Sequence, residues 1–502
     1  MRQTVGILGT PVDNLDMTAV LARLEQFISE HRFHQVATAN TDFLINALED
    51  PELRCILHTA DLVIPDGMPL IWASRLMGAP LPERVTGADL VPKLAALAAE
   101  KGYKIFMLGA KPEVAQLART RLIASNPGLQ IVGCVSPRVA PLVDMNHEEI
   151  LEAIRAACPD ILLVAFGNPK QEKWIHMNRR ALADVSVCIG VGATFDFIAG
   201  HTSRAPQWMQ RSGLEWVYRL QQEPRRLGGR YMRDLAHFSR HLVQQWWALK
   251  RQSTKGVTEI QTGKMGDFTV ISIVGDICGR SVPNIQDAAV AALNSHTDLV
   301  FDLHQATSVD AQGMGMLINL HKRAAAHQRE MRLACVPLQV AGALKGGRLI
   351  DPAYCGAPTL ASALSLPRIS GLTWQVRCGA DAALIEAKGE AETDSVSRLG
   401  VICSKLLKAG RRVDIDMREV RYVDINLLRM LCRLAGDGAG ESNLRVVPSE
   451  EMRGFLRREK LLNRLTLLAT PEPPPDDAEH LDIPHDLRDL HDPEAASARA
   501  AQ

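Results

Sequence analysis

Apolar runs without polar alternation recur along the first two hundred residues, separated by stretches with helical spacing. Leu62-Val63-Ile64 is one such run, and uninterrupted apolar strands are typical of sheets buried on both faces. Between the runs, apolar residues return every three or four positions, as over residues 16–30, which indicates amphipathic helices. The pattern predicts an α/β domain at residues 1–200 with a doubly wound, mostly parallel, Rossmann-like sheet. Strands are predicted to begin near residues 3, 35, 62, 104, 129, 160 and 185, and one helix is predicted over 42–57.

Polar or glycine residues follow these predicted strands at their carboxyl ends. In an open parallel sheet such ends share one edge, and ligand crevices form there. The set comprises Thr38, Asn40, Asp66, Gly67, Gly109, the segment Gly167 to Gln171 and the segment Gly192 to Asp196. Asp66 taken alone is better explained as a turn or helix-cap carboxylate, because Asp-Gly is common turn chemistry. The set as a whole predicts one ligand-binding crevice.

A basic, aromatic segment follows at residues 201–250. Residues 201–255 carry nine Arg and two Lys against three acidic residues, and four of the seven Trp lie at 208, 216, 246 and 247. Helical spacing around Trp216, with a break at 222–230, predicts a helical appendage that contacts an anionic membrane surface. A helix pair packed on the main domain is a compatible alternative. Nucleic-acid binding is a third reading, which no nucleic-acid motif supports.

An internal repeat occupies most of the remaining chain. Val300 to Leu317 aligns with Asp414 to Leu431, and in each copy a strand leads through Val-Asp into an apolar helix. We therefore predict two sibling αβ domains at residues 267–367 and 370–470, preceded by a polar linker at 251–266. Residues 471–502 hold nine acidic residues against two Arg and begin with a Pro-rich run. This composition predicts a disordered tail.

The overall composition is that of a soluble globular protein, with 46% hydrophobic residues and a formal net charge of zero over 502 residues. The ten cysteines are scattered without a C-x-x-C pair, which favours free thiols in a reducing cytosol over disulfides or zinc. The first apolar run is too short for a signal peptide, and no stretch of about 18 apolar residues predicts a transmembrane helix. We expect a cytoplasmic protein whose membrane contact is peripheral.

Motifs along residues 1–247 resemble, in order and spacing, those of the WecG/TagA/CpsF family of bacterial glycosyltransferases. They are Thr38-Ala-Asn-Thr-Asp42, Ala60-Asp-Leu-Val-Ile-Pro-Asp-Gly67, Glu83-Arg-Val-Thr-Gly-Ala-Asp89, Phe166-Gly-Asn-Pro-Lys-Gln-Glu-Lys-Trp174, Gly190-Val-Gly-Ala-Thr-Phe-Asp196 and Gly213-Leu-Glu-Trp-Val-Tyr-Arg219. Each is weak alone, but together they are specific. The resemblance implies transfer of an N-acetylmannosamine-type sugar, or of glucose or a relative, from UDP to a lipid-diphosphate-linked sugar. It also implies that the enzyme acts at the cytoplasmic face of the membrane and that it needs no metal ion.

The resemblance assigns roles to individual residues. Asp66 matches the family's proposed base, which deprotonates the acceptor hydroxyl in an inverting transfer. Arg84 matches a position where a guanidinium stabilises charge on the departing diphosphate, and residues 1–247 contain no Asp-x-Asp metal motif. Thr38 completes the predicted catalytic set. The predicted substrate-binding residues are Asn40, Gly67, Gly109, Asn168, Gln171, Gly192 and Asp196, and the appendage arginines predicted to close over the site are Arg219, Arg225, Arg226 and Arg230.

Residue type alone offers a structural alternative for several of these assignments. Arg84 is also explained as a surface ion-pair partner, Gln171 as a residue of a first helical turn, and Asp196 as a turn cap. The matched motifs favour the functional interpretation of Asp66 most strongly, and that of the appendage arginines least.

The sibling domains resemble STAS domains, small αβ modules related to anti-sigma-factor antagonists. The first copy matches at Val309-Asp-Ala-Gln-Gly-Met-Gly-Met-Leu317, and the second copy is degenerate. Where the family usually has a phosphorylatable Ser, this chain has Ala311, and Ile425 in the second copy. The resemblance therefore implies binding of an unknown protein partner without a phosphorylation switch at either loop.

The main hypothesis is an inverting, UDP-sugar-dependent glycosyltransferase that serves assembly of a bacterial surface polysaccharide. Its predicted partners are a UDP-sugar donor, a polyprenyl-diphosphate-linked acceptor and the inner face of the cytoplasmic membrane. No nucleic acid, metal or other cofactor is predicted, and self-association stays open. A catalytically inactive scaffold that acts through the STAS-like modules is the alternative, against which the joint presence of Thr38, Asp66, Arg84 and Gln171 argues. A nucleotide-binding oxidoreductase is disfavoured because no G-x-G-x-x-G turn follows an early strand.

Overall fold

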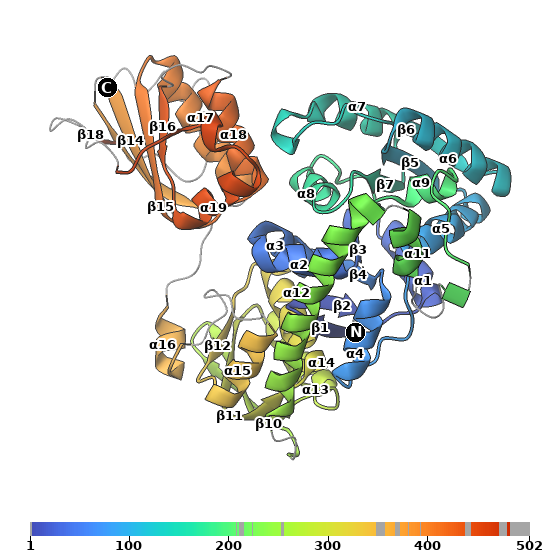
Figure 1. Ribbon diagram of the computed structural model, residues 1–502. Coiled ribbons are helices and arrows are strands. Elements are labelled where there is room, and N and C mark those ends of the chain that lie inside the picture. Colours follow the sequence, from blue (N-terminus) through green and yellow to red (C-terminus); the bar gives the residue numbers. More distant parts are fainter. Residues whose placement is uncertain are drawn as a thin grey trace. The chain divides into compact units, whose positions relative to one another are not determined.

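The computed structural model describes residues 3–206, 208–209, 215–222, 224–252, 256–347, 357–366, 372–379, 381–391, 393–436, 443–470 and 479–481. The chain forms two compact units (Figure 1). The first comprises Met1–Arg138 and Asn146–Pro367, and the second comprises Val139–Met145 and Arg368–Gln502.

A six-stranded parallel sheet organises the first half of the first unit. Its strands are β3 (His34–Ala39), β4 (Leu62–Pro65), β5 (Lys104–Gly109), β6 (Gln130–Val135), β7 (Ile161–Ala165) and β8 (Val187–Gly190), in the order β4-β3-β8-β7-β5-β6. Every neighbouring pair is parallel. The predicted α/β class is confirmed, and the carboxyl ends of the six strands share one edge.

Both faces of this sheet are covered. Val36, Leu62 and Ile64 belong to a core with α1 (Met17–Ser29), α5 (Gly87–Lys101) and α6 (Pro112–Ser125). Ala37 and Val63, one residue further along the same strands, belong to a core with α2 (Thr41–Glu49), α3 (Pro51–Thr59) and α4 (Met68–Leu76). Successive strand residues point to opposite faces, so the sheet is doubly wound as predicted. The remaining helices of this part are α7 (His147–Ala157), α8 (Lys170–Met177) and α9 (Thr194–Ile198).

Two predicted elements differ from the structure. The amino-terminal strand, β1 (Thr4–Ile7), lies outside the main sheet and pairs antiparallel with β2 (Thr10–Asp13) in a two-stranded hairpin. The single helix predicted over 42–57 is split into α2 and α3. Asp50 stands before Pro51 and adopts an extended backbone, which ends α2, while its carboxylate accepts from the N–H groups of Glu52 and Leu53 at the start of α3.

The appendage is helical, as α11 (Glu215–Gln222) and α12 (Pro224–Lys250). The predicted break at 222–230 is shorter than expected, because α12 starts at Pro224 and continues through Arg230. The second half of α12 packs on the rest of the first unit. The Gln245 side chain is fully buried there; it accepts from Leu8 N–H at 3.0 Å and donates to the carbonyl of Gly6 at 2.8 Å. This half matches the predicted alternative of a helix packed on the main domain.

A four-stranded sheet completes the first unit. Its strands are β9 (Glu259–Met265), β10 (Phe268–Ile277), β11 (Asp298–Val309) and β12 (Met331–Ala334), in the order β12-β11-β10-β9. β9 runs antiparallel to β10, and the other pairs are parallel. β9 falls in the predicted linker at 251–266, and its polar sequence reflects an exposed edge strand. The helices are α13 (Val282–Asn294), α14 (Ala311–Ala326), α15 (Leu338–Gly346) and α16 (Leu360–Ser365).

The second unit repeats this arrangement with β13 (Thr373–Cys378), β14 (Ala382–Glu390), β15 (Arg412–Tyr422) and β16 (Leu444–Val447). β13 is antiparallel to β14, and the β14–β15 and β15–β16 pairs are parallel. Register shifts also match, at Ser272/Val274 in β10 and Glu386/Lys388 in β14. Its helices are α17 (Thr393–Lys408), α18 (Ile425–Ala435) and α19 (Glu450–Arg458). The strand order supports the internal repeat read from the sequence.

Short elements lie at the edges of the second sheet. They are β17 (Thr466–Leu467), beside β16, and β18 (Glu479–Leu481), beside β13. β18 falls in the region predicted as a disordered tail, and residues 471–478 and 482–502 of that region lie outside the described residues.

Candidate functional site

Asp66 directly follows β4 and is held at the carboxyl edge of the sheet. Its backbone N–H donates to the carbonyl of Ala39 at 2.7 Å, which extends the β3–β4 contact beyond Pro65. The N–H of Val85 donates to the carbonyl of Pro65 at 2.9 Å and so fixes the loop that carries Arg84 beside the same strand end. The structure therefore brings the two main predicted catalytic residues to one place.

A cluster of alternating charges continues from Arg84. Its guanidinium donates to the carboxylate of Glu215 at 2.7 Å, and these side chains are only 14% and 8% exposed. Arg204 binds both carboxylate oxygens of Asp89, and its Nε lies 3.8 Å from Oε1 of Glu215. These ion pairs join the Arg84 loop, helix α5 and the appendage at the end of β4.

The charge of Asp66 also acts on this cluster, through Arg204. Burial opposes any rise in the pKa of Arg204, but Asp89, Glu215 and Asp66 together raise it. Burial likewise acts to raise the pKa of Asp89, and the hydrogen bonds from Arg204 and Thr86 hold that pKa below its usual range. Both side chains therefore stay charged, and Arg204 offers a second guanidinium near the carboxylate of Asp66.

Sequence reasoning missed Arg204, Asp89 and Glu215. One signal was available: Glu215 is one of only three acidic residues among eleven basic ones in residues 201–255. An isolated carboxylate in so basic a segment suggests a specific cationic partner.

Thr38, Asn40 and Gly67 lie on the neighbouring strand ends, with structural contacts of their own. The hydroxyl of Thr38 donates to the carbonyl of Gly190 at 2.8 Å and links β3 to β8. The side chain of Asn40 caps α2 by accepting from Phe43 N–H at 3.2 Å. Gly67 has an extended backbone, with φ of 174°, so no left-handed conformation explains a glycine there. Its Cα faces Asn40, which a Cβ would approach to 3.7 Å.

Gln171 connects two of the predicted loops. Its side-chain oxygen accepts from the N–H groups of Gly167 and Gly192, each at 3.0 Å, and the side chain is buried. Its amide donates to Glu172 at 2.8 Å. The side-chain amide of Gln171 thus makes its hydrogen bonds within the protein, and in this structure it connects the loops after β7 and β8.

Gly109 on β5 pairs with Ala165 at the end of β7, and Asn168 lies in the loop that follows β7. Gly109 has a positive φ of 102°, and a Cβ there would lie 2.7 Å from the carbonyl oxygen of Ala165, so only glycine fits. Asn168 accepts from Asn46 at 2.8 Å and donates to Glu172 at 3.2 Å. Asp196 lies on α9, where its backbone carbonyl accepts from His201 and Thr202.

The four appendage arginines are placed only by their backbone. Arg219 lies on α11, and Arg225, Arg226 and Arg230 lie on α12, while their side chains fall outside the described part of the chain. Their predicted closure over the site stays a prediction.

Two buried ionisable groups next to Gln171 were not predicted. Burial raises the pKa of Glu172 to about 8, against the hydrogen bonds from Gln171 and Asn168, and the charge of Asp42 adds to the rise. Lys173 is buried as well, and its Nζ lies 2.8 Å from Asp50 and 2.9 Å from Glu52. Both belong to the motif from Phe166 to Trp174, and these two of its charged residues lie in the protein interior.

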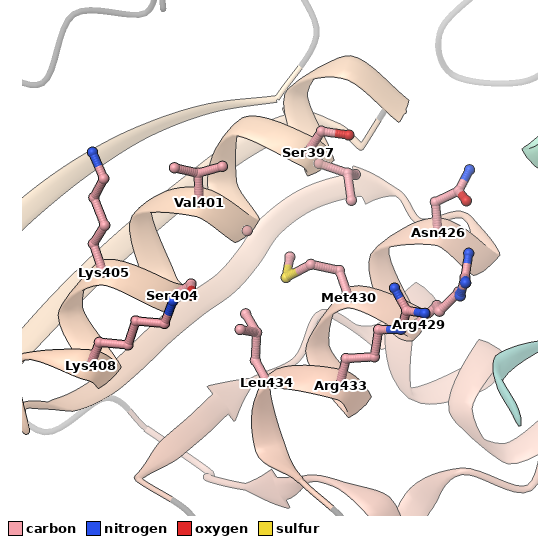
Figure 2. Close-up of a pocket in the computed structure, with 12 residues that line it drawn as sticks. Ser397, Val401, Ser404, Lys405, Lys408, Asn426, Arg429, Met430, Arg433 and Leu434 are labelled. Carbon is pink, nitrogen blue, oxygen red and sulfur yellow. The ribbon is translucent and has the colours of Figure 1, made fainter. Parts of the chain in front are cut away.

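A separate groove of about 540 Å³ lies in the second unit between α17 and α18 (Figure 2). Lys405, Lys408, Arg429 and Arg433 supply its charge, and no acidic side chain is among its described lining residues. The groove shares no residue with the strand-end cluster.

The fold and the strand-end cluster define an α/β protein in which a carboxylate stands beside guanidinium groups. Residues 5–252 match the model of the glycosyl transferase WecG/TagA/CpsF family, and residues 259–351 match that of the STAS domain. The chain belongs to the WecG/TagA/CpsF family and is a glycosyltransferase that carries a STAS domain. The STAS match begins at β9, which agrees with the strand found in place of the predicted linker.

Two similar curated proteins are transferases of one activity. An N-acetylglucosaminyldiphosphoundecaprenol N-acetyl-beta-D-mannosaminyltransferase of Bacillus spizizenii is 32% identical over 222 residues, which cover 43% of this chain and 84% of that protein. Its namesake from Staphylococcus aureus is 27% identical over 45% of this chain and 87% of its own length. Among solved structures, the anti-sigma factor antagonist SpoIIAA in its unphosphorylated form is similar over 15% of this chain and 72% of its own, at 15% identity and a TM-score of 0.15. Among the described helices, none is long and apolar enough to cross a membrane.

Proposed function

We propose that this glycosyltransferase moves an N-acetylmannosamine-type sugar, or a glucose- or glucuronate-type sugar, from UDP to a polyprenyl-diphosphate-linked acceptor. The observation that carries the proposal is the pairing of Asp66 with the Arg84 loop at the end of β4, through the Val85–Pro65 bond of 2.9 Å. The named activity of the relatives supports the lipid-diphosphate acceptor.

In this proposal, transfer occurs with inversion. Asp66 takes the proton of the acceptor hydroxyl as the oxygen attacks the anomeric carbon. The bond from that carbon to the β-phosphate oxygen breaks, and negative charge collects on the departing UDP. Arg84 and Arg204 stand at the same strand end and stabilise that charge, which makes a metal unnecessary.

The appendage gives this enzyme its proposed place at the membrane. α12 carries five Arg and one Lys against a single Asp. Trp208 and Trp247 are 64% and 53% exposed. Basic and aromatic side chains together bind the interface of an anionic bilayer, where the lipid-linked acceptor resides. The proposed localisation is therefore the inner face of the cytoplasmic membrane, and the STAS domain is proposed to mediate protein contacts.

A donor screen with the full-length chain tests the proposal. UDP-N-acetylmannosamine, UDP-glucose and UDP-glucuronate are offered with a short-chain lipid-diphosphate N-acetylglucosamine acceptor, for the wild type and for Asp66→Asn. We expect transfer from one donor, loss of at least about 10³-fold in kcat for the variant, and a product of inverted anomeric configuration by NMR. Near-normal turnover of Asp66→Asn would remove Asp66 from its proposed role. Absence of both turnover and UDP-sugar binding by calorimetry would instead favour an inactive scaffold.

A further inference from the structure

Helix α14 of the STAS domain is buried on two sides. All eight residues from Gly313 to Leu320 are buried, whereas a helix on a domain surface exposes one side in every turn. Met314, Leu317 and Leu320 belong to the core of the STAS sheet. Ala311 belongs to the transferase core, together with Val5 and Ile7 of the β1–β2 hairpin. The helix thus connects the two domains of the first unit.

The contact between α14 and the hairpin is close and specific. A Cβ on Gly315 would lie 2.6 Å from the carbonyl oxygen of Thr4, and a Cβ on Gly6 would lie 2.9 Å from the Cβ of Met314. Asn319 donates to the hydroxyl of Thr4 at 2.8 Å inside this contact. Two glycines are needed for helix and strand to approach this closely.

The second copy of the repeat lacks these features. In the alignment of the two copies, Arg429 stands at the position of Gly315, and Arg433 stands at the position of Asn319. Both arginines lie on α18 and line the groove between α17 and α18 (Figure 2). An arginine at position 315 would prevent the approach to Thr4. The docking surface on α14 is therefore particular to the first copy.

The same helix reaches the strand that leads to Asp66. Nζ of Lys322 donates to the carbonyl of Ala60 at 2.8 Å and lies 3.1 Å from Oδ1 of Asp61. The other oxygen of Asp61 accepts from the N–H of Gln35 at 3.0 Å, which ties the starts of β3 and β4 together. Only the four residues of β4 separate Asp61 from Asp66.

β4 is the edge strand of the main sheet, so one side of it has no neighbouring strand in that sheet. The hairpin covers this side, where Asp13 accepts from the N–H of Val63 at 2.6 Å. α14 in turn holds the hairpin and, through Lys322, the start of β4. An edge strand is more mobile than a central one unless it is covered in this way.

We propose that the STAS domain acts within its own chain as a positioning module for the transferase site, and that Lys322 is a positioning residue for Asp66. The kinetic part of this inference rests on the proposed role of Asp66. Its structural part, that Lys322 restrains β4, does not.

The test compares three full-length variants with the wild type. Lys322→Met removes the ammonium group and keeps the aliphatic stem, Lys322→Arg retains the charge, and Arg323→Met changes an exposed residue one position along the same helix. Hydrogen exchange is measured on peptides that cover residues 61–73. We expect the β4 amides of Lys322→Met to exchange about tenfold faster, those of Arg323→Met to match the wild type, and Lys322→Arg to recover most of the protection.

Kinetics give the second readout. For Lys322→Met we expect kcat to fall about tenfold, with the KM for the donor changed less than about twofold. If Lys322→Met destabilises the whole unit, Asp61→Asn replaces it: this variant removes the negative charge that Lys322 faces and keeps an oxygen for the N–H of Gln35, and a smaller loosening of β4 in the same direction is expected. The effects of Lys322→Met and Asp61→Asn should be less than additive in the double variant, since both weaken the Lys322–Asp61 contact, while Lys322 also holds Ala60 and Asp61 also holds Gln35.

Equal exchange of residues 61–73 in Lys322→Met and Arg323→Met would overturn the inference, whatever the activities are. Unchanged kcat in a variant with loosened β4 would overturn its kinetic part. Failure of the proposed function appears differently, as a wild type that transfers no sugar from any donor, and the exchange comparison is unaffected by that result.

Discussion

The guanidinium of Arg84 donates to the carboxylate of Glu215 at 2.7 Å, so a predicted catalytic residue is paired with the first residue of α11. Neither side chain exceeds 14% exposure, so solvent screens their attraction less than it does at a surface. This pair attaches the appendage to the site. In the proposed mechanism, Glu215 therefore competes with the diphosphate of the donor for this guanidinium.

Removing that competition should strengthen nucleotide binding. Glu215→Gln keeps the size of the side chain and a hydrogen-bond acceptor but removes its charge. We expect the Kd for UDP to fall about threefold to tenfold, because charge-assisted hydrogen bonds of Arg84 become available to phosphate. Calorimetry on the full-length chain measures this, with Glu113→Gln on the exposed side of α6 as the control. Weaker binding would show instead that Glu215 holds Arg84 in its binding position.

The position of Asp66 at a shared sheet edge follows from sequence pattern, because buried parallel strands such as Leu62–Pro65 have a distinct apolar signature. The same signature misplaced Thr4–Ile7. An apolar four-residue run does not specify which partner strand it joins, and its actual partner, Thr10–Asp13, contains a proline that weakens any strand pattern.

Ion pairs left no comparable trace. Arg84 and Glu215 are 131 positions apart, and charged residues follow no periodicity that would connect them. The docking of α14 on the hairpin could not be predicted either. A glycine within a helical pattern, such as Gly315, indicates a less stable helix and does not by itself indicate a close contact with another segment. Contacts between distant segments thus escaped the sequence, whereas the strands of the six-stranded parallel sheet and their carboxyl ends did not.

Gln171 should matter for folding as much as for substrate. Gln171→Leu leaves the partly buried N–H groups of Gly167 and Gly192 without their acceptor, and each donor that is left unsatisfied away from water costs on the order of 1–3 kcal/mol. We expect a loss of about 3 kcal/mol in the free energy of unfolding of the first unit. Urea denaturation of the full-length chain measures it. Gln116→Leu, on the exposed side of α6, is the control. A stable Gln171→Leu variant that has lost UDP-sugar binding would favour the predicted substrate contact.

Lys173 should be required for stability rather than for turnover. Its ammonium group lies between Asp50 and Glu52, which are both buried, so Lys173→Met leaves two buried carboxylates without their cation. Breaking a buried pair in this way costs about 3–5 kcal/mol. We expect a large drop in the thermal unfolding temperature at pH 7, with little change for the exposed Lys93→Met on α5. A fall in kcat without loss of stability would contradict this assignment.

Glu172 should make the stability of the first unit depend on pH. Burial raises its pKa to about 8 from an ordinary value of 4.5, so the folded protein holds a proton that the unfolded chain releases between these two values. The folded state then binds more protons, and its stability falls as pH rises from about 4.5 to 8. Glu172→Gln resembles the protonated acid and cannot ionise. Both oxygens of Glu172 accept hydrogen bonds, so the NH2 group of the Gln side chain costs the variant a pH-independent offset; beyond this offset, we expect its unfolding temperature relative to the wild type to rise steadily from pH 4.5 to pH 8. Melting curves at several pH values measure the difference, and a constant offset across that range would show that Glu172 does not carry this proton.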